Sequence, residues 1–238
     1  MLDVHQNIET LAQQKGKVLL PNGRRAKRAI LWIWIVLALE AICGILSYRE
    51  YGLYQSIANG VDIPEEAVDA NDMIEGIAGI LCALAYVVSA ITFIMWFKRA
   101  YHNLHRSVSH RLAYSEGWAT GCWFAPVINL YRSYQIMREL YLATKGWLAK
   151  KGMEANLVLS TAALGWWWAL WLISVVSVSI ANHFIKHADT LDEMIESSIV
   201  SMVSSAIILP LALITVKVVR DYANAETLLA EHQEGCAE

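Results

Sequence analysis

The sequence predicts an all-α membrane protein with four transmembrane helices. First, 56% of the 238 residues are hydrophobic and the mean hydropathy is +0.38, whereas apolar residues make up about 45–50% of an ordinary soluble domain. Second, four apolar stretches are long enough to cross a hydrocarbon core about 30 Å thick. Third, the basic residues are concentrated in alternating segments of the chain, which is typical of membrane topology.

The predicted spans divide the chain into a lead at 1–28, a membrane domain at 29–219 and a tail at 220–238. The lead is polar and lacks a small-residue cleavage signature, so we expect an uncleaved first span rather than a signal peptide. Asn71 is predicted to cap the second span, and Thr190 with Glu193 forms a capping-box pattern before the fourth. In chain order the spans are 29–47, 74–97, 157–181 and 198–219.

The distribution of Lys and Arg predicts the orientation. Seventeen of the nineteen lie in three regions: the lead, the 98–156 loop, and the end of the fourth span with the tail. The positive-inside rule assigns these regions, and therefore both termini, to the cytoplasm. We expect a multi-pass protein of the cell inner (plasma) membrane, of bacterial type. The acidic outer loops at 48–73 and 182–197 are interpreted as solvated surface rather than as a rim that gathers cations.

Glu40 is the ionisable candidate inside the membrane. It shares one helical face of the first span with Cys43, Gly44 and Ser47, and such small and polar faces favour packing against protein. A carboxyl group near the bilayer centre costs at least a few kcal/mol unless it finds a partner, a proton or water. Two interpretations stay open: a functional group for transport, and a protonated or hydrogen-bonded residue that locks helices together.

The cysteines and the central tryptophans favour packing roles. The spacing of Cys43, Cys82, Cys122 and Cys236 matches no zinc or redox motif, so we expect no disulfide framework and interpret them as small apolar residues. Four tryptophans near the middle of the third span offer a stacking surface for a flat ligand such as a quinone, but shape-filling packing is favoured. They are Trp166, Trp167, Trp168 and Trp171.

The 98–156 loop carries the richest pattern. The second span is expected to continue as a helix through WFKRAYHNLHR. The apolar stretch at 118–125 is too short to cross and ends at Pro126, so an interfacial or re-entrant segment is expected there. From Val127 onward, apolar residues at helical spacing predict an amphipathic helix that lies along the membrane surface or caps the bundle. The repeating positions are Leu130, Tyr131, Tyr134, Met137 and Tyr141.

The sequence of this loop resembles that of the bacterial membrane family called domain of unknown function 4328. The match runs from Trp96 to Leu140, within a wider similarity of span pattern over about residues 75–220. Ser133 stands where the family is expected to carry proline. The resemblance implies a multi-span membrane protein and supplies no reaction. The matching positions are Trp96, Arg99, Asn103, Leu104, Gly117, Trp118, Gly121, Trp123, Phe124, Pro126, Asn129, Leu130, Arg132, Tyr134, Arg138, Glu139 and Leu140.

Polar residues of this loop are candidates for binding a lipid headgroup, because Arg pairs bidentately with phosphate. We expect four of them to converge where the loop meets the membrane, with Arg138 as a further candidate. The alternative, which we favour, is a structural network that ties the interfacial helix to the second span. The four are Arg99, Asn103, Asn129 and Arg132.

Enzymatic activity is not expected, because no nucleophile elbow, Walker loop or dinucleotide fingerprint occurs. The pairs His102 with His105 and His183 with His187 lie at opposite ends of the membrane domain, so no haem, metal or other cofactor is expected. Nucleic acid is not an expected partner; anionic lipid headgroups, a protein partner or a second copy are. The favoured function is a non-catalytic scaffold or complex subunit, followed by a small oligomeric transporter or channel using Glu40, and last by a lipid-handling enzyme.

Overall fold

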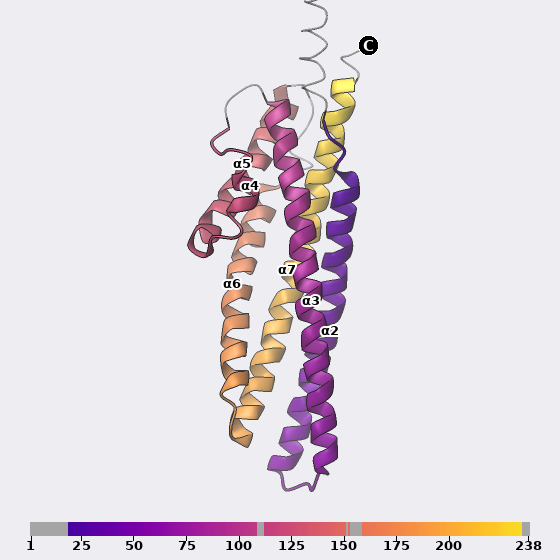
Figure 1. Cartoon of the computed structure of the whole chain (residues 1–238), viewed down its shortest axis with the longest axis vertical. Coiled ribbons are helices and arrows are strands. Elements are labelled where there is room, and N and C mark those ends of the chain that lie inside the picture. The colour runs from indigo at the N-terminus through magenta and orange to yellow at the C-terminus, as the bar shows by residue number, and fades with distance from the viewer. Residues whose placement is uncertain (1–18, 109–111, 151, 153–158, 235–238) are drawn as a thin grey trace, which may run out of the picture. The chain divides into compact units, whose positions relative to one another are not determined.

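The computed structural model describes residues 19–108, 112–150, 152 and 159–234. All regular secondary structure in these residues is helical (Figure 1). The helices are α2 (Gly23–Ala58), α3 (Glu65–Ser107), α4 (Trp118–Gly121), α5 (Pro126–Lys150), α6 (Thr161–Lys186) and α7 (Leu191–Glu234). The all-α prediction is therefore confirmed for the described part of the chain.

Four helices are long and apolar enough to cross a membrane. They are α2, α3, α6 and residues 191–231 of α7, which confirms the predicted number of membrane-length helices in the described residues. Three of them run well past the predicted spans, because adding residues to an existing helix costs far less than starting one. The predicted third span begins at residue 157; residues 157 and 158 lie outside the described residues, and α6 begins at Thr161.

The two predicted caps have different outcomes. The capping box before α7 is confirmed: the Thr190 backbone N–H donates to Glu193 Oε2 at 2.8 Å, and the Glu193 N–H donates to Thr190 Oγ1 at 3.4 Å. The Asn71 cap is wrong, because α3 already begins at Glu65. The Pro64 carbonyl accepts from the Ala67 N–H at 2.9 Å, and acidic residues in the first turn favour a helix start there.

The described chain divides into two compact units. Unit 1 comprises the described residues within Met1–Ala29, Thr92–Leu164 and Val218–Glu238, and unit 2 comprises Ile30–Ile91 and Gly165–Lys217. Unit 1 thus gathers almost the same three segments that the positive-inside rule assigns to the cytoplasm. Unit 2 gathers the greater part of the spans and the two acidic loops.

In unit 2, small residues allow α2 and α7 to approach closely. A Cβ added to Gly44 would lie 3.4 Å from the Ser205 Cβ, so glycine leaves just enough room for the serine. Many exposed side chains along the membrane-length helices of this unit are apolar; Ile80, for example, is 63% exposed. Such a surface is costly in water and favourable in lipid.

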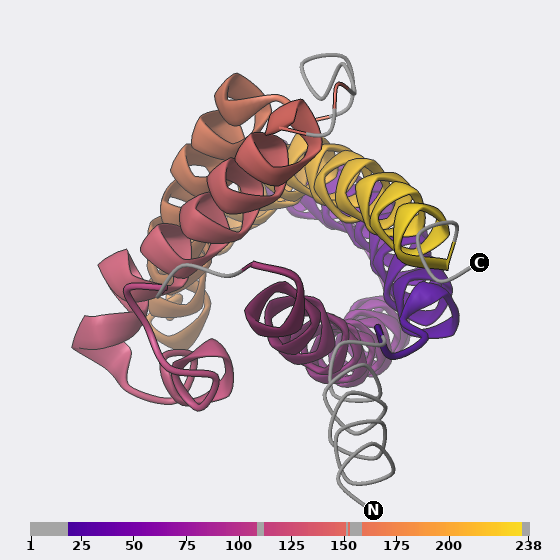
Figure 2. The same cartoon turned by 90° about the horizontal axis from the view of Figure 1, so that it is seen from above.

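In unit 1, aromatic side chains fill the core between α3, α5 and α7. Trp96 and Tyr222 are fully buried and lie edge to face, with ring centroids 6.0 Å apart. The C-terminal half of α5 lies beside α7 (Figure 2), where the Tyr141 hydroxyl donates to the Val218 carbonyl at 2.8 Å. Burial raises the pKa of Tyr141, so this hydroxyl stays protonated and keeps its donor.

The predicted amphipathic helix corresponds to α5, and α4 is a single helical turn within the predicted 118–125 segment. Met137 and Tyr141, two of the predicted apolar positions, are buried, whereas Leu130 and Tyr131 at the start of α5 are exposed. The apolar side of α5 is therefore divided: its C-terminal half packs inside unit 1, and its N-terminal part faces outward. An interfacial or re-entrant location for this region stays a prediction.

Candidate functional site

A buried carboxylate joins three distant parts of the chain in unit 1. Glu226 on α7 is 7% exposed, and its Oε1 accepts from Asn103 Nδ2 on α3 at 2.5 Å. Its Oε2 accepts from Asn22 Nδ2, just before α2, at 2.9 Å. Both carboxylate oxygens are therefore satisfied by amides, which is the requirement for burying such a group.

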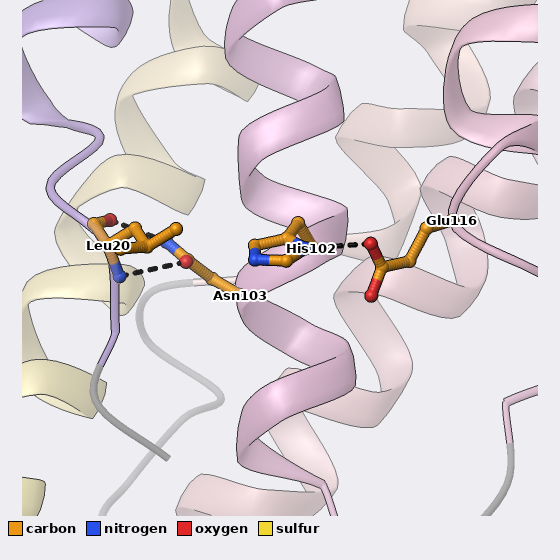
Figure 3. Close-up of polar contacts among 4 residues, drawn as sticks. All are labelled: Leu20, His102, Asn103 and Glu116. Carbon is orange, nitrogen blue, oxygen red and sulfur yellow. Dashed lines mark hydrogen bonds and ion pairs between the residues drawn. The ribbon is translucent and has the colours of Figure 1, made fainter. Parts of the chain in front are cut away.

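Asn103 extends this arrangement to the main chain of the N-terminal segment. Its side-chain oxygen accepts from the Leu20 N–H at 3.0 Å, and its Nδ2 also donates to the Leu20 carbonyl at 2.9 Å (Figure 3). The Asn103 side chain thus pairs with both the N–H and the carbonyl of Leu20, as the main chain of a neighbouring strand would. We call Glu226, Asn103, Asn22 and the Leu20 main chain the Glu226 cluster.

A second carboxylate joins α5 to α3 and to the 112–114 segment. Glu139 Oε2 accepts from the Tyr101 hydroxyl and Oε1 accepts from the Ala113 N–H, both at 2.6 Å. The Tyr101 hydroxyl also lies 3.0 Å from the Tyr114 carbonyl. These contacts fit the structural network between the loop helix and the second span that the sequence favoured, although the residues that form it were not the ones proposed.

A pocket of about 530 Å³ opens beside α3 and is lined mainly by charged side chains. The cations are Arg25 from α2 with Lys98 and Arg99 from α3. His102 Nδ1 contacts Glu116 Oε2 at 2.7 Å in an ion pair at one wall of the pocket. Figure 3 shows this pair pointing away from Asn103, so consecutive residues of α3 serve the pocket and the Glu226 cluster. We call this site the basic pocket.

The five predicted headgroup residues occupy different surroundings. Arg99 lines the basic pocket, while the neighbouring Asn103 is 1% exposed within the Glu226 cluster. Asn129 Oδ1 accepts from the Ser133 hydroxyl at 2.8 Å. Arg132 lies over the Tyr114 and Trp118 rings, at 4.9 and 5.5 Å from their centroids. Arg138 is exposed and lines a separate pocket of about 690 Å³ along α5. Whether any of the five binds a ligand stays a prediction.

Ser133, at the position where proline was expected, lies inside the continuous helix α5. Its Oγ is 3.3 Å from the buried Cys122 Sγ, which ties α5 to the residue that ends α4. Burial raises the pKa of the Cys122 thiol, and the hydrogen bond from Ser133 partly opposes this. The thiol therefore stays protonated and unreactive near neutral pH, in agreement with a packing role.

Glu40, in unit 2, accepts a hydrogen bond from the Ser205 hydroxyl at 3.3 Å. Further along α2, Cys43 Sγ contacts Cys82 Sγ of α3 at 2.7 Å, and Glu50 accepts from Ser198 of α7 at 2.8 Å. Sequence reasoning did not pair the two cysteines. These polar groups follow one face of α2 at helical spacing and include no Lys or Arg.

The histidines and the tryptophans make local ring contacts. His183 and His187 lie one turn apart on α6 with ring centroids 4.6 Å apart, and the described residues contain no group of three or more His, Cys, Asp or Glu arranged to hold a metal. Trp168 stacks on Trp171 at 4.7 Å, while Trp166 is 68% exposed.

The sequence did contain a signal for Glu226. Tyr222, Ala225 and Leu229 are buried at helical spacing on the same face, so an acidic residue stands among apolar ones in the last turns of α7. An acidic residue on an apolar face needs a buried partner. We missed the signal because we treated 220–238 as a tail outside the folded part of the chain.

Comparison with known proteins places the chain in a family without an assigned activity. The family model described as Domain of unknown function (DUF4328) matches residues 59–224. This range includes α3 and the loop with Asn103, Arg99 and Glu139, and excludes Asn22, Glu40 and Glu226. No curated protein and no solved structure matches the chain.

Proposed function

The chain belongs to the family described as Domain of unknown function (DUF4328), and from that premise we propose that it is a non-catalytic integral membrane scaffold. In this proposal, the four apolar helices anchor the protein, and unit 1 is a folded cytoplasmic platform that docks a protein partner or a second copy. The same bilayer-facing platform contacts anionic lipid headgroups. No step of this function requires a metal, a cofactor or a covalent intermediate.

The Glu226 cluster is the observation that carries the proposal. Asn22 precedes α2, Asn103 follows the second predicted span, and Glu226 follows the fourth. Because the Glu226 carboxylate accepts hydrogen bonds from both asparagines, we infer that the three segments emerge on one side of the membrane, which agrees with an even number of spans. The basic residues of these segments favour the cytoplasm as that side. Buried polar contacts between distant segments favour one defined fold, which a docking surface needs.

The surface of unit 1 around α4 supports contact with the bilayer. Phe124 and Val127 are 74% and 73% exposed, and Leu130 and Trp118 are also exposed. Exposed apolar side chains grouped around the start of a helix are typical of an interfacial segment. Arg132, which stacks on Trp118, places a cation among them, where it would meet lipid phosphate or an acidic partner.

Affinity purification in mild detergent tests the scaffold function. We compare the wild-type protein with Arg132→Ala and with Arg28→Ala, which removes an exposed basic residue of α2 as a charge-matched control. The proposal predicts a stoichiometric protein partner or a defined homo-oligomer that Arg132→Ala weakens and Arg28→Ala retains. A monomer that recovers no protein in stoichiometric amount would contradict it.

The second candidate is cation or proton transport through unit 2. Glu40, Cys43 and Glu50 lie on one face of α2 and contact Ser205 of α7, Cys82 of α3 and Ser198 of α7 in turn. Intramembrane carboxyl groups of this kind mark ion paths. The candidate ranks second because each of these contacts also serves helix packing.

A flux assay separates the two candidates. Proteoliposomes carrying Glu40→Gln are compared with wild type and with Glu65→Gln, which changes an exposed acidic residue at the start of α3. Transport predicts a proton or cation flux that is lost in Glu40→Gln alone. An equal flux in all three preparations, or none above empty vesicles, counts against a role for Glu40 in transport. The least favoured proposal, a lipid-handling enzyme, predicts a changed membrane lipid composition in Arg132→Ala cells.

A further inference from the structure

We propose that the basic pocket binds a phosphate group, and that its source is the headgroup of an anionic phospholipid. The proposal concerns a different surface from the partner-docking role, so either can fail without the other. Of the headgroup residues predicted from the sequence, Arg99 lines this pocket, together with Arg25, Lys98 and His102.

The charges of the pocket favour an anion. Three permanent cations face the space, against the single carboxylate of Glu116. That carboxylate already contacts His102 Nδ1 at 2.7 Å. Among the described residues, Arg25 and Lys98 have no carboxylate partner, whereas Arg99 is attracted by the buried carboxylate of Glu226. Arg25 also lies close enough to Arg99 for their charges to repel. A bound anion would remove this repulsion and satisfy the guanidinium donors, which suit phosphate oxygens.

The walls of the pocket are built from three separate parts of unit 1. Arg25 belongs to the first turn of α2, and Lys98, Arg99 and His102 lie on consecutive turns of α3. The His102–Glu116 pair joins the residues before α4 to α3 at 2.7 Å. Beyond Glu116, the pocket is lined by Gly117, which contributes no side chain. The Glu226 cluster fixes the same turns of α2 and α3, so the spacing of the cations follows from the fold.

An apolar side chain at the edge of the pocket favours a lipid as the source of the phosphate. Met95 lines the pocket, is 49% exposed and belongs to the predicted second span. Lys98 and Arg99 follow about one turn later, just past the end of that span. The pocket therefore offers an apolar edge on the span side and cations at the predicted boundary, which matches an acyl chain joined to an anionic headgroup. Its volume of about 530 Å³ lies in the range of small-molecule sites.

The test uses the purified full-length chain in a neutral detergent. Binding of dioctanoyl phosphatidic acid is measured by isothermal titration calorimetry and compared with dioctanoyl phosphatidylcholine and with inorganic phosphate. The variants are Arg99→Gln and the exposed Lys98→Gln. Arg24→Gln is the matched control, because Arg24 is an exposed arginine next to the lining residue Arg25.

We expect phosphatidic acid to bind wild type and Arg24→Gln equally, and about tenfold more weakly after loss of one charge-assisted contact in either pocket variant. Phosphatidylcholine should bind weakly, since its choline cation meets a basic pocket. If Arg99→Gln fails to fold, the affinity of Lys98→Gln for phosphatidic acid still tests the proposal. Equal phosphatidic acid affinity in Lys98→Gln and Arg24→Gln, or no binding to wild type, overturns the proposal. Inorganic phosphate that binds as tightly as the lipid overturns the assignment to a lipid and leaves a site for soluble phosphate.

Discussion

Replacement of Glu226 by alanine is predicted to destabilise unit 1 strongly. The change removes the acceptor for Asn22 Nδ2 and Asn103 Nδ2, both of which are buried. Each Nδ2 keeps a bond to a carbonyl, that of Trp96 for Asn22 and that of Leu20 for Asn103, so one N–H donor of each amide is left without a partner, at about 1–3 kcal/mol each. Two such donors, with the cavity left by the side chain, give a loss of about 3–5 kcal/mol in the free energy of unfolding. Glu226→Gln keeps one acceptor oxygen and should cost about 1–2 kcal/mol.

The assay is equilibrium unfolding in mixed dodecyl maltoside and sodium dodecyl sulfate micelles, followed by tryptophan fluorescence. Glu231→Ala is the control, because Glu231 is an exposed acidic residue of the same helix, and it should change the free energy by less than about 0.5 kcal/mol. Equal effects of the alanine changes at positions 226 and 231 would refute the reasoning. The reasoning would also be refuted if Glu226→Ala were no less stable than Glu226→Gln, because the loss of acceptor oxygens would then not determine the loss in unfolding free energy.

Three further predictions concern packing and capping. An oxidant should join Cys43 to Cys82 within one chain, so that a maleimide polymer adds to two of the four cysteines under denaturing conditions instead of to all four; four additions after oxidation would contradict their contact. Gly44→Leu should lower the unfolding free energy by about 1–3 kcal/mol through overpacking against α7, while Gly52→Leu, with open space around it, should not; similar losses would argue against close packing at Gly44. Thr190→Ala should cost about 1 kcal/mol by removing the helix cap, measured in the same unfolding assay, and no loss would mean that the capping box adds no stability.

The elements that could be predicted from sequence are those set by local pattern. Apolar length identified the four membrane-length helices, and the spacing of Thr190 and Glu193 identified a cap. The Asn71 cap was wrong because the prediction started the helix at the beginning of the apolar stretch. Pro64 and the acidic residues that follow it start α3 earlier, and the polar turns continue the same helix into the apolar ones.

The candidate site was less predictable because it depends on contacts between residues far apart in the chain. Asn103 was one of the candidate residues, and its partner Glu226 is 123 residues away. Periodicity shows which face of a helix is apolar; it does not show which distant helix covers that face. The same limit applies to Cys43 and Cys82, whose contact requires the register of α2 against α3.

The central claim is that the described residues of the lead, the 98–156 loop and the tail form one folded body on one side of the membrane. The most direct test is cysteine labelling with a membrane-impermeant maleimide in sealed, right-side-out vesicles of a cysteine-free variant. We predict that Arg24→Cys, Lys98→Cys and Glu231→Cys are labelled only after the vesicles are opened, and that Asp62→Cys in the acidic loop is labelled in intact vesicles. Labelling of any one of the first three in intact vesicles while another stays protected would contradict the account, because residues on opposite sides of a bilayer cannot share the Glu226 cluster.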